Sequence, residues 1–364
     1  MNANIHSRDG VLEWLALALV PGVSPGAQRK LLETLGSPRA IAGAAGATIA
    51  TIAGSPAAEA LASGPDPSLV ERSLEWLDGT GCHLVAMGDP DYPRALLHIA
   101  DPPVVLYARG RVELLNSNAF AIVGSRNATA LGVRDAEAIG CALSNAGLTI
   151  VSGLALGVDA AAHRGGLAGA ASSVAVMGTG PDLLYPRRNR DLALRIAAEG
   201  CLVTEFPVGT PSAAGNFPRR NRLISGLSCG VLVVEAALES GSLITAKCAL
   251  EQGRDVFAVP GSIHSTLSKG CHWLIKEGAK LVESADDVLD ELGIQMASAS
   301  RENASEEPEC DPLLKIMGHA PMSFDEFAMH TGLGAATLAA RLTRLELDGH
   351  IEALPGGRFQ RVRP

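Results

Sequence analysis

Residues 120–151 read FAIVGSRNATALGVRDAEAIGCALSNAGLTIV, and this stretch carries the clearest structural pattern in the chain. The apolar run at 120–123 predicts a buried strand, and a Gly-Ser-Arg turn follows it. Residues 133–145 have helical patterning, and the run at 149–151 predicts a second strand. A strand, a turn, a helix and another strand form the repeating unit of a parallel sheet with helices packed on its faces.

The same alternation continues to about residue 294. Four more short apolar or β-branched runs predict strands at 174–177, 202–204, 231–234 and 256–259. Two further helices are predicted at 192–199 and 243–252. This pattern predicts an α/β fold with a Rossmann-like, mostly parallel sheet, in which ligands bind beyond the carboxyl ends of the strands.

Changes in the pattern of apolar and polar residues divide the chain into three zones and a linker. Residues 1–80 have helical patterns and predict an N-terminal all-α domain, and residues 81–294 hold the Rossmann-like sheet. The polar, acidic residues 295–310 predict a flexible linker. Residues 311–364 combine a short helix, a helix-turn-helix pattern and a Gly-Gly hairpin, which together predict a C-terminal winged helix.

The composition indicates a soluble globular protein and excludes one coated with basic charge. The 364 residues are 47% hydrophobic, and 30 Lys and Arg against 39 Asp and Glu give a formal net charge of −9. Seven cysteines without a C-x-x-C pair are typical of reduced thiols and disfavour both a disulfide framework and a structural zinc site. The apolar run at 11–20 is too short to cross a bilayer, so we expect a cytoplasmic protein without a membrane segment.

A six-residue pattern of one aromatic residue, three arginines and an amide occurs twice, as YPRRNR at 185–190 and FPRRNR at 217–222. Guanidinium groups bind phosphate oxygens, and an aromatic ring can stack on an unpaired base. Two copies at turns after predicted strands therefore favour a ligand with phosphates and bases. In the alternative, the aromatic residues anchor the core and the arginines cap helices or pair with nearby acids.

Two Gly- and Ser-containing turns are candidate anion sites, because each leads into a helix whose first backbone N–H groups can point at an anion. The first holds Gly124, Ser125 and Arg126, and the second holds Gly241 and Ser242. Neither has the spacing of a P-loop or of a dinucleotide-binding fingerprint. For the first turn, a generic strand-to-helix connection is the alternative.

Two pairs of titratable residues are candidates for catalysis or metal binding. Asp159 and His163 share a helix face at i, i+4, and a structural Asp–His hydrogen bond is the favoured interpretation. Glu235 and Glu239 lie where related sheets that cleave nucleotides carry a carboxylate, although a helix-capping or loop-bracing Glu235 is at least as well supported. No committed catalytic set, metal site or cofactor is expected.

The flanking zones carry weaker signals of nucleic-acid binding. VPGVSPG at 20–26 looks like the turn of a helix-hairpin-helix, whose backbone N–H groups contact DNA phosphates, and a plain helical hairpin is the alternative. In the last zone, residues 337–347 form the candidate recognition helix, with Arg341 and Arg344. Equal numbers of basic and acidic residues there favour contact with protein over duplex binding.

Several segments between residues 118 and 282 together resemble the DprA/Smf family of DNA-processing proteins. In chain order they are GSRNATALG, SGLALGVDAAAH, MGTGPDLLYPRRNRDLA, TEFPVGTP, FPRRNRLISGLS, VVEAALESGSLITAKCALEQGRDVFAVPG and LIKEGA. The resemblance implies a Rossmann-like domain that binds and protects single-stranded DNA, forms a dimer and helps load the recombinase RecA during natural transformation. It also implies a binding protein and not an enzyme.

The resemblance further implies which residues bind the DNA. They belong to the Gly-Ser-Arg turn, the Tyr-Pro loop and the Phe-Pro-x-Arg-Asn-Arg segment: Gly124, Ser125, Arg126, Arg187, Arg188, Phe217, Arg219, Asn221 and Arg222. Family members often have lysine in the Tyr-Pro loop, and arginine keeps the charge while altering the geometry. The rival hypothesis is a nucleotide-processing hydrolase similar to nucleoside-monophosphate phosphoribohydrolases. A third is a transcription factor that acts through the winged helix.

Overall fold

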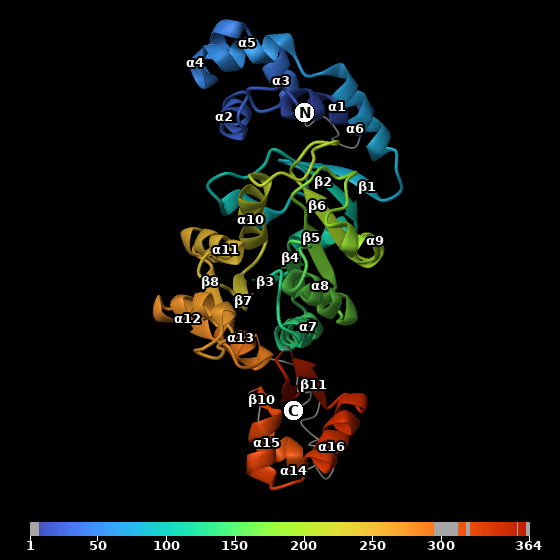
Figure 1. Ribbon diagram of the computed structural model, residues 1–364. Helices are drawn as coiled ribbons and strands as arrows, with labels where there is room; N and C mark the ends of the chain where they lie inside the picture. The colour runs from blue at the N-terminus through green and yellow to red at the C-terminus, as the bar shows by residue number, and fades with distance from the viewer. Residues whose placement is uncertain (1–6, 295–311, 318–320, 355, 362–364) are drawn as a thin grey trace. The chain divides into compact units, whose positions relative to one another are not determined.

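The computed structural model describes residues 7–294, 312–317, 321–354 and 356–361. It divides into two compact units, residues 1–295 and 296–364 (Figure 1). The predicted linker at 295–310 lies outside the described residues. No helix within the described ranges is long and apolar enough to cross a membrane.

A nine-stranded mixed sheet forms the centre of the first unit, in the order β1-β2-β6-β5-β4-β3-β7-β8-β9. Strands β3 to β9 are parallel, whereas β1 and β2 pair antiparallel at one edge. The strands are β1 Cys82–Ala86, β2 Val105–Gly110, β3 Ala119–Gly124, β4 Thr149–Ser152, β5 Ser173–Val176, β6 Cys201–Thr204, β7 Gly230–Val234, β8 Asp255–Ala258 and β9 Lys280–Leu281. The predicted Rossmann-like fold is confirmed, and β3 to β8 are the six predicted strands.

Helices cover both faces of this sheet, so its central strands are buried throughout. Along β3, Phe120 and Ile122 pack against one layer of helices, and Ala121 and Val123 pack against the other. The first layer contains α7 Ala130–Asn145, α8 Val158–Ala168, α9 Arg190–Glu199 and α13 Ala285–Glu291. The second contains α10 Asn216–Gly226, α11 Gly241–Glu251 and α12 Lys269–Lys276 (Figure 1).

The chain reverses its direction of travel across the sheet between β3 and β7. These two strands are parallel neighbours, yet β3 leads into α7 on one face and β7 leads into α11 on the other. Adjacent loops that leave in opposite directions open a crevice at the carboxyl ends of the strands, which is where doubly wound sheets bind ligands. The fold therefore places its candidate site at this switch point.

Six helices precede the sheet within the part of the chain described from residue 7 onward: α1 Arg8–Ala18, α2 Pro25–Leu35, α3 Pro38–Gly43, α4 Gly46–Ala53, α5 Ser55–Ser63 and α6 Pro67–Leu77. Proline begins several of them after a Ser or Asp cap, as in α2, where the Ser24 side chain accepts a hydrogen bond from the Ala27 N–H. Trp14 of α1 shares a core cluster with Leu84 of β1 and Tyr107 of β2. The helices therefore pack on the antiparallel edge of the sheet.

The second unit folds as a small helical domain with a three-stranded antiparallel sheet. It contains α14 Pro312–Met317, β10 Met322–Ser323, α15 Phe324–Thr331, α16 Ala335–Leu347, β11 Ile351–Leu354 and β12 Arg358–Arg361, with strand order β10-β12-β11. Phe327 and Leu338 are fully buried between the helices. The predicted winged helix is confirmed.

Candidate nucleic-acid interface

The switch point between β3 and β7 opens into a pocket of about 620 Å³. It is lined by the β3–α7 loop, the β4–α8 loop, α10 and the first turn of α11. The structure brings seven of the predicted site residues to this pocket: Gly124, Ser125, Arg126, Phe217, Asn221, Gly241 and Ser242. The other four predicted residues are not part of its lining: Arg187, Arg188, Arg219 and Arg222.

The Gly-Ser-Arg turn forms one wall of the pocket. A Cβ atom at Gly124 would lie 1.8 Å from the Val234 carbonyl oxygen, so only glycine lets β3 end this close to β7. The buried Ser125 hydroxyl accepts a hydrogen bond from the backbone N–H two residues ahead (3.1 Å) and closes the turn. Arg126 is exposed at the tip, with its guanidinium carbon 5.4 Å from the Phe217 ring centroid.

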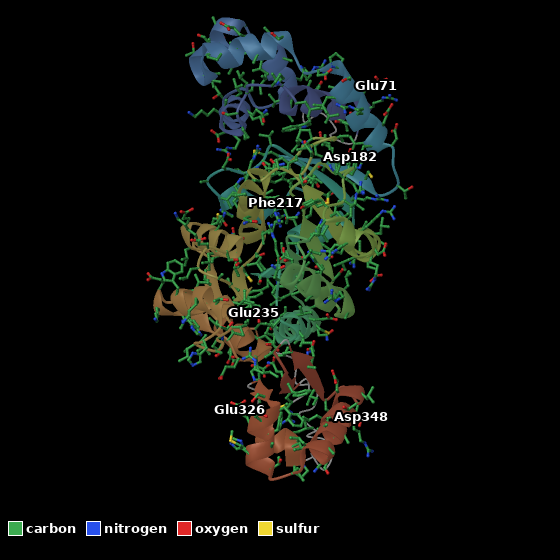
Figure 2. All side chains as sticks on the ribbon, in the orientation of Figure 1. Glu71, Asp182, Phe217, Glu235, Glu326 and Asp348 are labelled. Carbon is green, nitrogen blue, oxygen red and sulfur yellow. The ribbon has the colours of Figure 1, made fainter. Side chains whose placement is uncertain are left out.

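Phe217 and Arg126 line the pocket, and the ring of Tyr185 contacts that of Phe217 beside it; we call these three residues the rim. Phe217 lies on α10 (Figure 2), and its ring centroid is 5.9 Å from that of Tyr185, with the planes inclined by 38°. A Cβ atom at Gly178 would lie 2.9 Å from the Phe217 ring, so the ring packs directly on the backbone. Tyr185 is 48% exposed, which leaves the rim accessible to a flat ligand.

The two copies of the repeated pattern fold differently. The first copy includes the short 3₁₀ helix Arg187–Asn189, where Arg187 and Arg188 are exposed and form no ion pair with any described residue. The second copy lies within α10, which begins at Asn216, so the prediction that both copies lie in turns is wrong for the second. In a helix, successive side chains point in different directions, and the arginines of the second copy are separated onto different faces.

Arg219 and Arg222 lie on the face of α10 opposite to the one that holds Phe217 and lines the pocket. Both donate to the same oxygen of Glu205, with Nη2–Oε2 distances of 2.8 Å and 2.6 Å. The Arg222 side chain is only 14% exposed. These two residues therefore match the structural alternative, in which the arginines pair with nearby acids.

Arg220 is a pocket residue that the sequence analysis missed. It is 4% exposed, and its Nε and Nη1 atoms have no hydrogen-bond partner among the described residues. Its guanidinium lies against Gly153, where a Cβ atom would be 1.5 Å from Nη1. The sequence motif Phe-Pro-x-Arg-Asn-Arg could have identified Arg220, because its first arginine falls at 220 and its variable position at 219.

The charge of Arg220 is balanced by one buried carboxylate. Burial lowers the pKa of Arg220 to about 10, and the attraction of Asp159 opposes that shift, so the guanidinium stays charged at neutral pH. A buried cation with unpartnered N–H groups beside an open pocket is suited to an anionic ligand. The N-terminus of α11 faces the same pocket, with Gly241 and Ser242 in its first turn. Its partial positive charge adds to the attraction for an anion.

The predicted hydrogen bond between Asp159 and His163 is wrong, because both side chains bind the backbone of the β4–α8 loop instead. The Asp159 carboxylate accepts from the N–H groups of Gly153 (3.1 Å) and Ala155 (3.3 Å), and His163 Nε2 accepts from the Leu154 N–H (3.2 Å). Burial lowers the pKa of His163 to about 3 and raises that of Asp159. The pair braces the loop beneath Arg220, and the described residues contain no cluster of three potential metal ligands.

Glu235, labelled in Figure 2, binds Thr129, the N-cap residue of α7, and is not among the residues that line the pocket. Its carboxylate accepts hydrogen bonds from the Thr129 N–H (2.8 Å) and the Thr129 hydroxyl (2.5 Å). Its backbone has a φ of 53°, in the left-handed region that non-glycine residues seldom adopt. Glu239 lines the pocket and is exposed. This geometry agrees with the loop-bracing interpretation of Glu235.

Comparisons of the sequence with known families match both units. The family described as DNA recombination-mediator protein A matches residues 83–293, and the one described as DprA winged helix domain matches residues 297–357. Protein Smf from Escherichia coli (strain K12) is 43% identical over 304 residues, which cover 81% of each chain. DNA processing protein DprA from Streptococcus pneumoniae is 47% identical over 204 residues, which cover 56% of this chain and 72% of that protein.

Two solved structures are similar to the described fold. DNA processing protein A from Streptococcus pneumoniae superposes with a TM-score of 0.69 at 37% identity and covers 80% of this chain and 99% of its own. The protein of the same name from Helicobacter pylori, described as having a unique single-stranded DNA binding mode, superposes with a TM-score of 0.53 at 28% identity. It covers 58% of this chain and 95% of its own. The matched family region contains the switch-point pocket.

Proposed function

The chain belongs to the DprA/Smf family of DNA recombination-mediator proteins, and from this premise we propose that it binds single-stranded DNA at the rim and in the switch-point pocket. The observation that carries the proposal is the contact of the Phe217 ring with Tyr185 and Arg126, beside the buried Arg220 whose Nε and Nη1 atoms have no hydrogen-bond partner among the described residues. Unpaired bases stack on aromatic rings, and guanidinium groups bind the phosphates between them. Duplex DNA has no unpaired base to offer such a rim.

In this proposal each group has a separate task. Bases stack on Phe217 and Tyr185, one phosphate contacts Arg126, and a second enters the pocket toward Arg220 and the N-terminus of α11. Arg187 and Arg188 extend the positive surface along the strand, since they are exposed and form no ion pair among the described residues. None of these contacts reads a base edge, so binding tolerates sequence. The net charge of −9 limits adhesion to DNA elsewhere on the molecule.

The biological role follows from the family. We propose that the protein protects incoming single-stranded DNA and helps load RecA on it, acting as a homodimer in the cytoplasm without catalysis of its own. The family description of a recombination mediator supports this role, as does the single-stranded DNA binding described for the Helicobacter pylori relative.

The test is fluorescence anisotropy of a labelled oligo-dT at low and moderate salt, with wild type and Arg126→Ala. Wild type is expected to bind, and the variant to bind roughly tenfold or more weakly, because a hydrogen bond to a charged group contributes about 1.5–3 kcal/mol. Losing one phosphate contact also reduces the salt dependence, by about 0.7 in the slope of log K against log salt.

Arg111→Ala is the matched control. Arg111 is also exposed, and it pairs with Glu113 at the opposite end of the sheet, next to the start of β6. It is expected to bind oligo-dT as tightly as wild type does. Absence of binding by wild type, or equal losses in Arg126→Ala and Arg111→Ala, contradicts the proposed site.

A further inference from the structure

A chain of ion pairs joins the N-terminal helices to α10 on the side away from the pocket. We call it the clamp, and its members are Arg29, Asp101, Arg222, Glu205 and Arg219. They come from α2, from the segment before β2, from α10 and from the residue after β6. The clamp therefore connects parts of the chain that are far apart in sequence.

Glu205 is the centre of the clamp. Its side chain is 2% exposed, and one of its oxygens accepts hydrogen bonds from Arg219 (2.8 Å) and Arg222 (2.6 Å). The two arginines are three residues apart and lie on one face of α10. A carboxylate this deeply buried is stable only while its cationic partners remain in place, so it restrains the helix that carries them.

Asp101 extends the clamp to the N-terminal helices. Its Oδ2 lies 3.8 Å from Arg222 Nη2, and its other carboxylate oxygen pairs with Arg29 of α2. Arg29 also donates to the carbonyl oxygens of Ala100 (3.1 Å) and Pro102 (3.2 Å). Arg29 thus attaches α2 to the segment that carries Asp101. A shift of α2 would move the Asp101 carboxylate, which contacts Arg222 of α10.

The opposite face of α10 carries the groups that would meet DNA. Phe217 and Arg220 line the pocket from that face, and Asn221 donates to the Gly241 carbonyl oxygen at the start of α11 (3.2 Å). A helix moves as a rigid element, so a rotation that loosened Arg219 and Arg222 would also displace the Phe217 ring and the Arg220 guanidinium. Helix α10 therefore contributes to the clamp from one face and to the pocket from the opposite face.

We propose that Glu205 and Asp101 are positioning residues for the nucleic-acid site, and that through Asp101 the N-terminal helices help to set the orientation of α10. This inference rests on the proposed single-stranded DNA binding. The positioning role and simple electrostatics predict opposite changes in DNA affinity when either carboxylate is removed. Both residues are negatively charged, so removing either charge should strengthen DNA binding if charge alone mattered. A positioning role requires that binding weakens.

The experiment measures oligo-dT anisotropy for Glu205→Gln and Asp101→Asn beside wild type and Arg126→Ala. Each carboxylate variant is expected to bind about 2- to 30-fold more weakly, the range for coupling through a packed network. Arg29→Gln is expected to weaken binding in the same direction. Glu113→Gln removes an exposed carboxylate at the other end of the sheet and serves as the control, with affinity equal to or slightly above that of wild type.

A second measurement separates positioning from a general loss of stability. Hydrogen exchange of the amides in α10 is expected to accelerate in Glu205→Gln and Asp101→Asn at a temperature where circular dichroism shows the proteins folded. Asp101 is 45% exposed, so Asp101→Asn keeps the test available if Glu205→Gln does not fold.

The outcomes distinguish this inference from the function on which it rests. If wild type and Arg111→Ala do not bind oligo-dT, the proposed function and the clamp's role in it fail together. If wild type binds and Arg126→Ala weakens binding, but Asp101→Asn and a folded Glu205→Gln bind as tightly as wild type or more tightly, only the positioning role is overturned.

Discussion

Replacing Glu235 by glutamine distinguishes a helix-capping carboxylate from a catalytic one. Glu235 accepts two hydrogen bonds from Thr129 at the start of α7, one from the N–H (2.8 Å) and one from the hydroxyl (2.5 Å). The Glu235→Gln side chain keeps one acceptor oxygen and replaces the other by an amide that can only donate. The remaining oxygen can accept from the Thr129 N–H, and the amide can donate to the Thr129 hydroxyl, so both hydrogen bonds lose their charged acceptor and the second reverses its direction.

The expected cost follows from these two changes. A hydrogen bond to a charged group contributes about 1.5–3 kcal/mol to stability and a neutral one about 0.5–1.5 kcal/mol. The interaction of a negative charge with a helix N-terminus adds about 0.3–1 kcal/mol. Glu235 is half-buried and Thr129 is exposed, so water offsets part of the loss. We expect Glu235→Gln to lower the free energy of unfolding by about 1–2 kcal/mol.

The assay is urea denaturation at pH 7, with Glu239→Gln as the matched control. Glu239 is exposed and forms no hydrogen bond or ion pair with the described residues, so its variant should stay within about 0.5 kcal/mol of wild type. Thr129→Ala also loses the cap that accepts the Gly132 N–H (3.0 Å). The double variant of Glu235→Gln and Thr129→Ala should lose less than the sum of the two single changes.

The same variants address nucleotide hydrolysis. The binding function predicts no hydrolysis of nucleoside monophosphates by wild type, and therefore nothing for Glu235→Gln to remove. An unchanged free energy of unfolding in Glu235→Gln, together with hydrolysis that wild type performs and the variant does not, would refute the capping argument and favour a catalytic carboxylate.

Two further predictions concern the β4–α8 loop, where Gly153 lies against Arg220 and His163 binds the Leu154 N–H. Gly153→Ala places a methyl group 1.5 Å from the present position of Arg220 Nη1, so it should displace the guanidinium, cost about 1–3 kcal/mol of stability and weaken oligo-dT binding. Gly46→Ala, where a Cβ atom meets nothing within 4 Å, should do neither, and equal effects would contradict the reasoning. The pKa of His163 is about 3 in the folded protein against an ordinary value of 6.5, so the unfolded chain binds more protons between those values. The contribution of neutral, buried His163 to the free energy of unfolding is therefore complete above pH 6.5 and should fall with decreasing pH, by up to about 1.4 kcal/mol per pH unit. His163→Gln should flatten this dependence in urea titrations at pH 7, 6 and 5.

The central strands were predictable because each is a short apolar run buried on both faces. The edge strands were not. In β1 only the last three residues are buried, and β9 has two exposed residues, so neither forms a continuous apolar run. Strand β2 lies between β1 and β6, but it contains Arg109 and ends at Gly110, which interrupts the apolar pattern.

The sequence alone determined the parallel sheet, its turns and the family, because alternation of strands and helices and the Gly-Ser-Arg turn are local patterns that neighbouring residues impose. Only the tertiary structure decided which arginines are available to a ligand. Arg220 reaches the pocket while Arg219 and Arg222 bind Glu205, since the angular position of each residue on α10 selects its neighbours. Ion pairs between residues far apart in the chain, such as Arg29 and Asp101, depend on how complete elements pack, and no local pattern in the sequence encodes them.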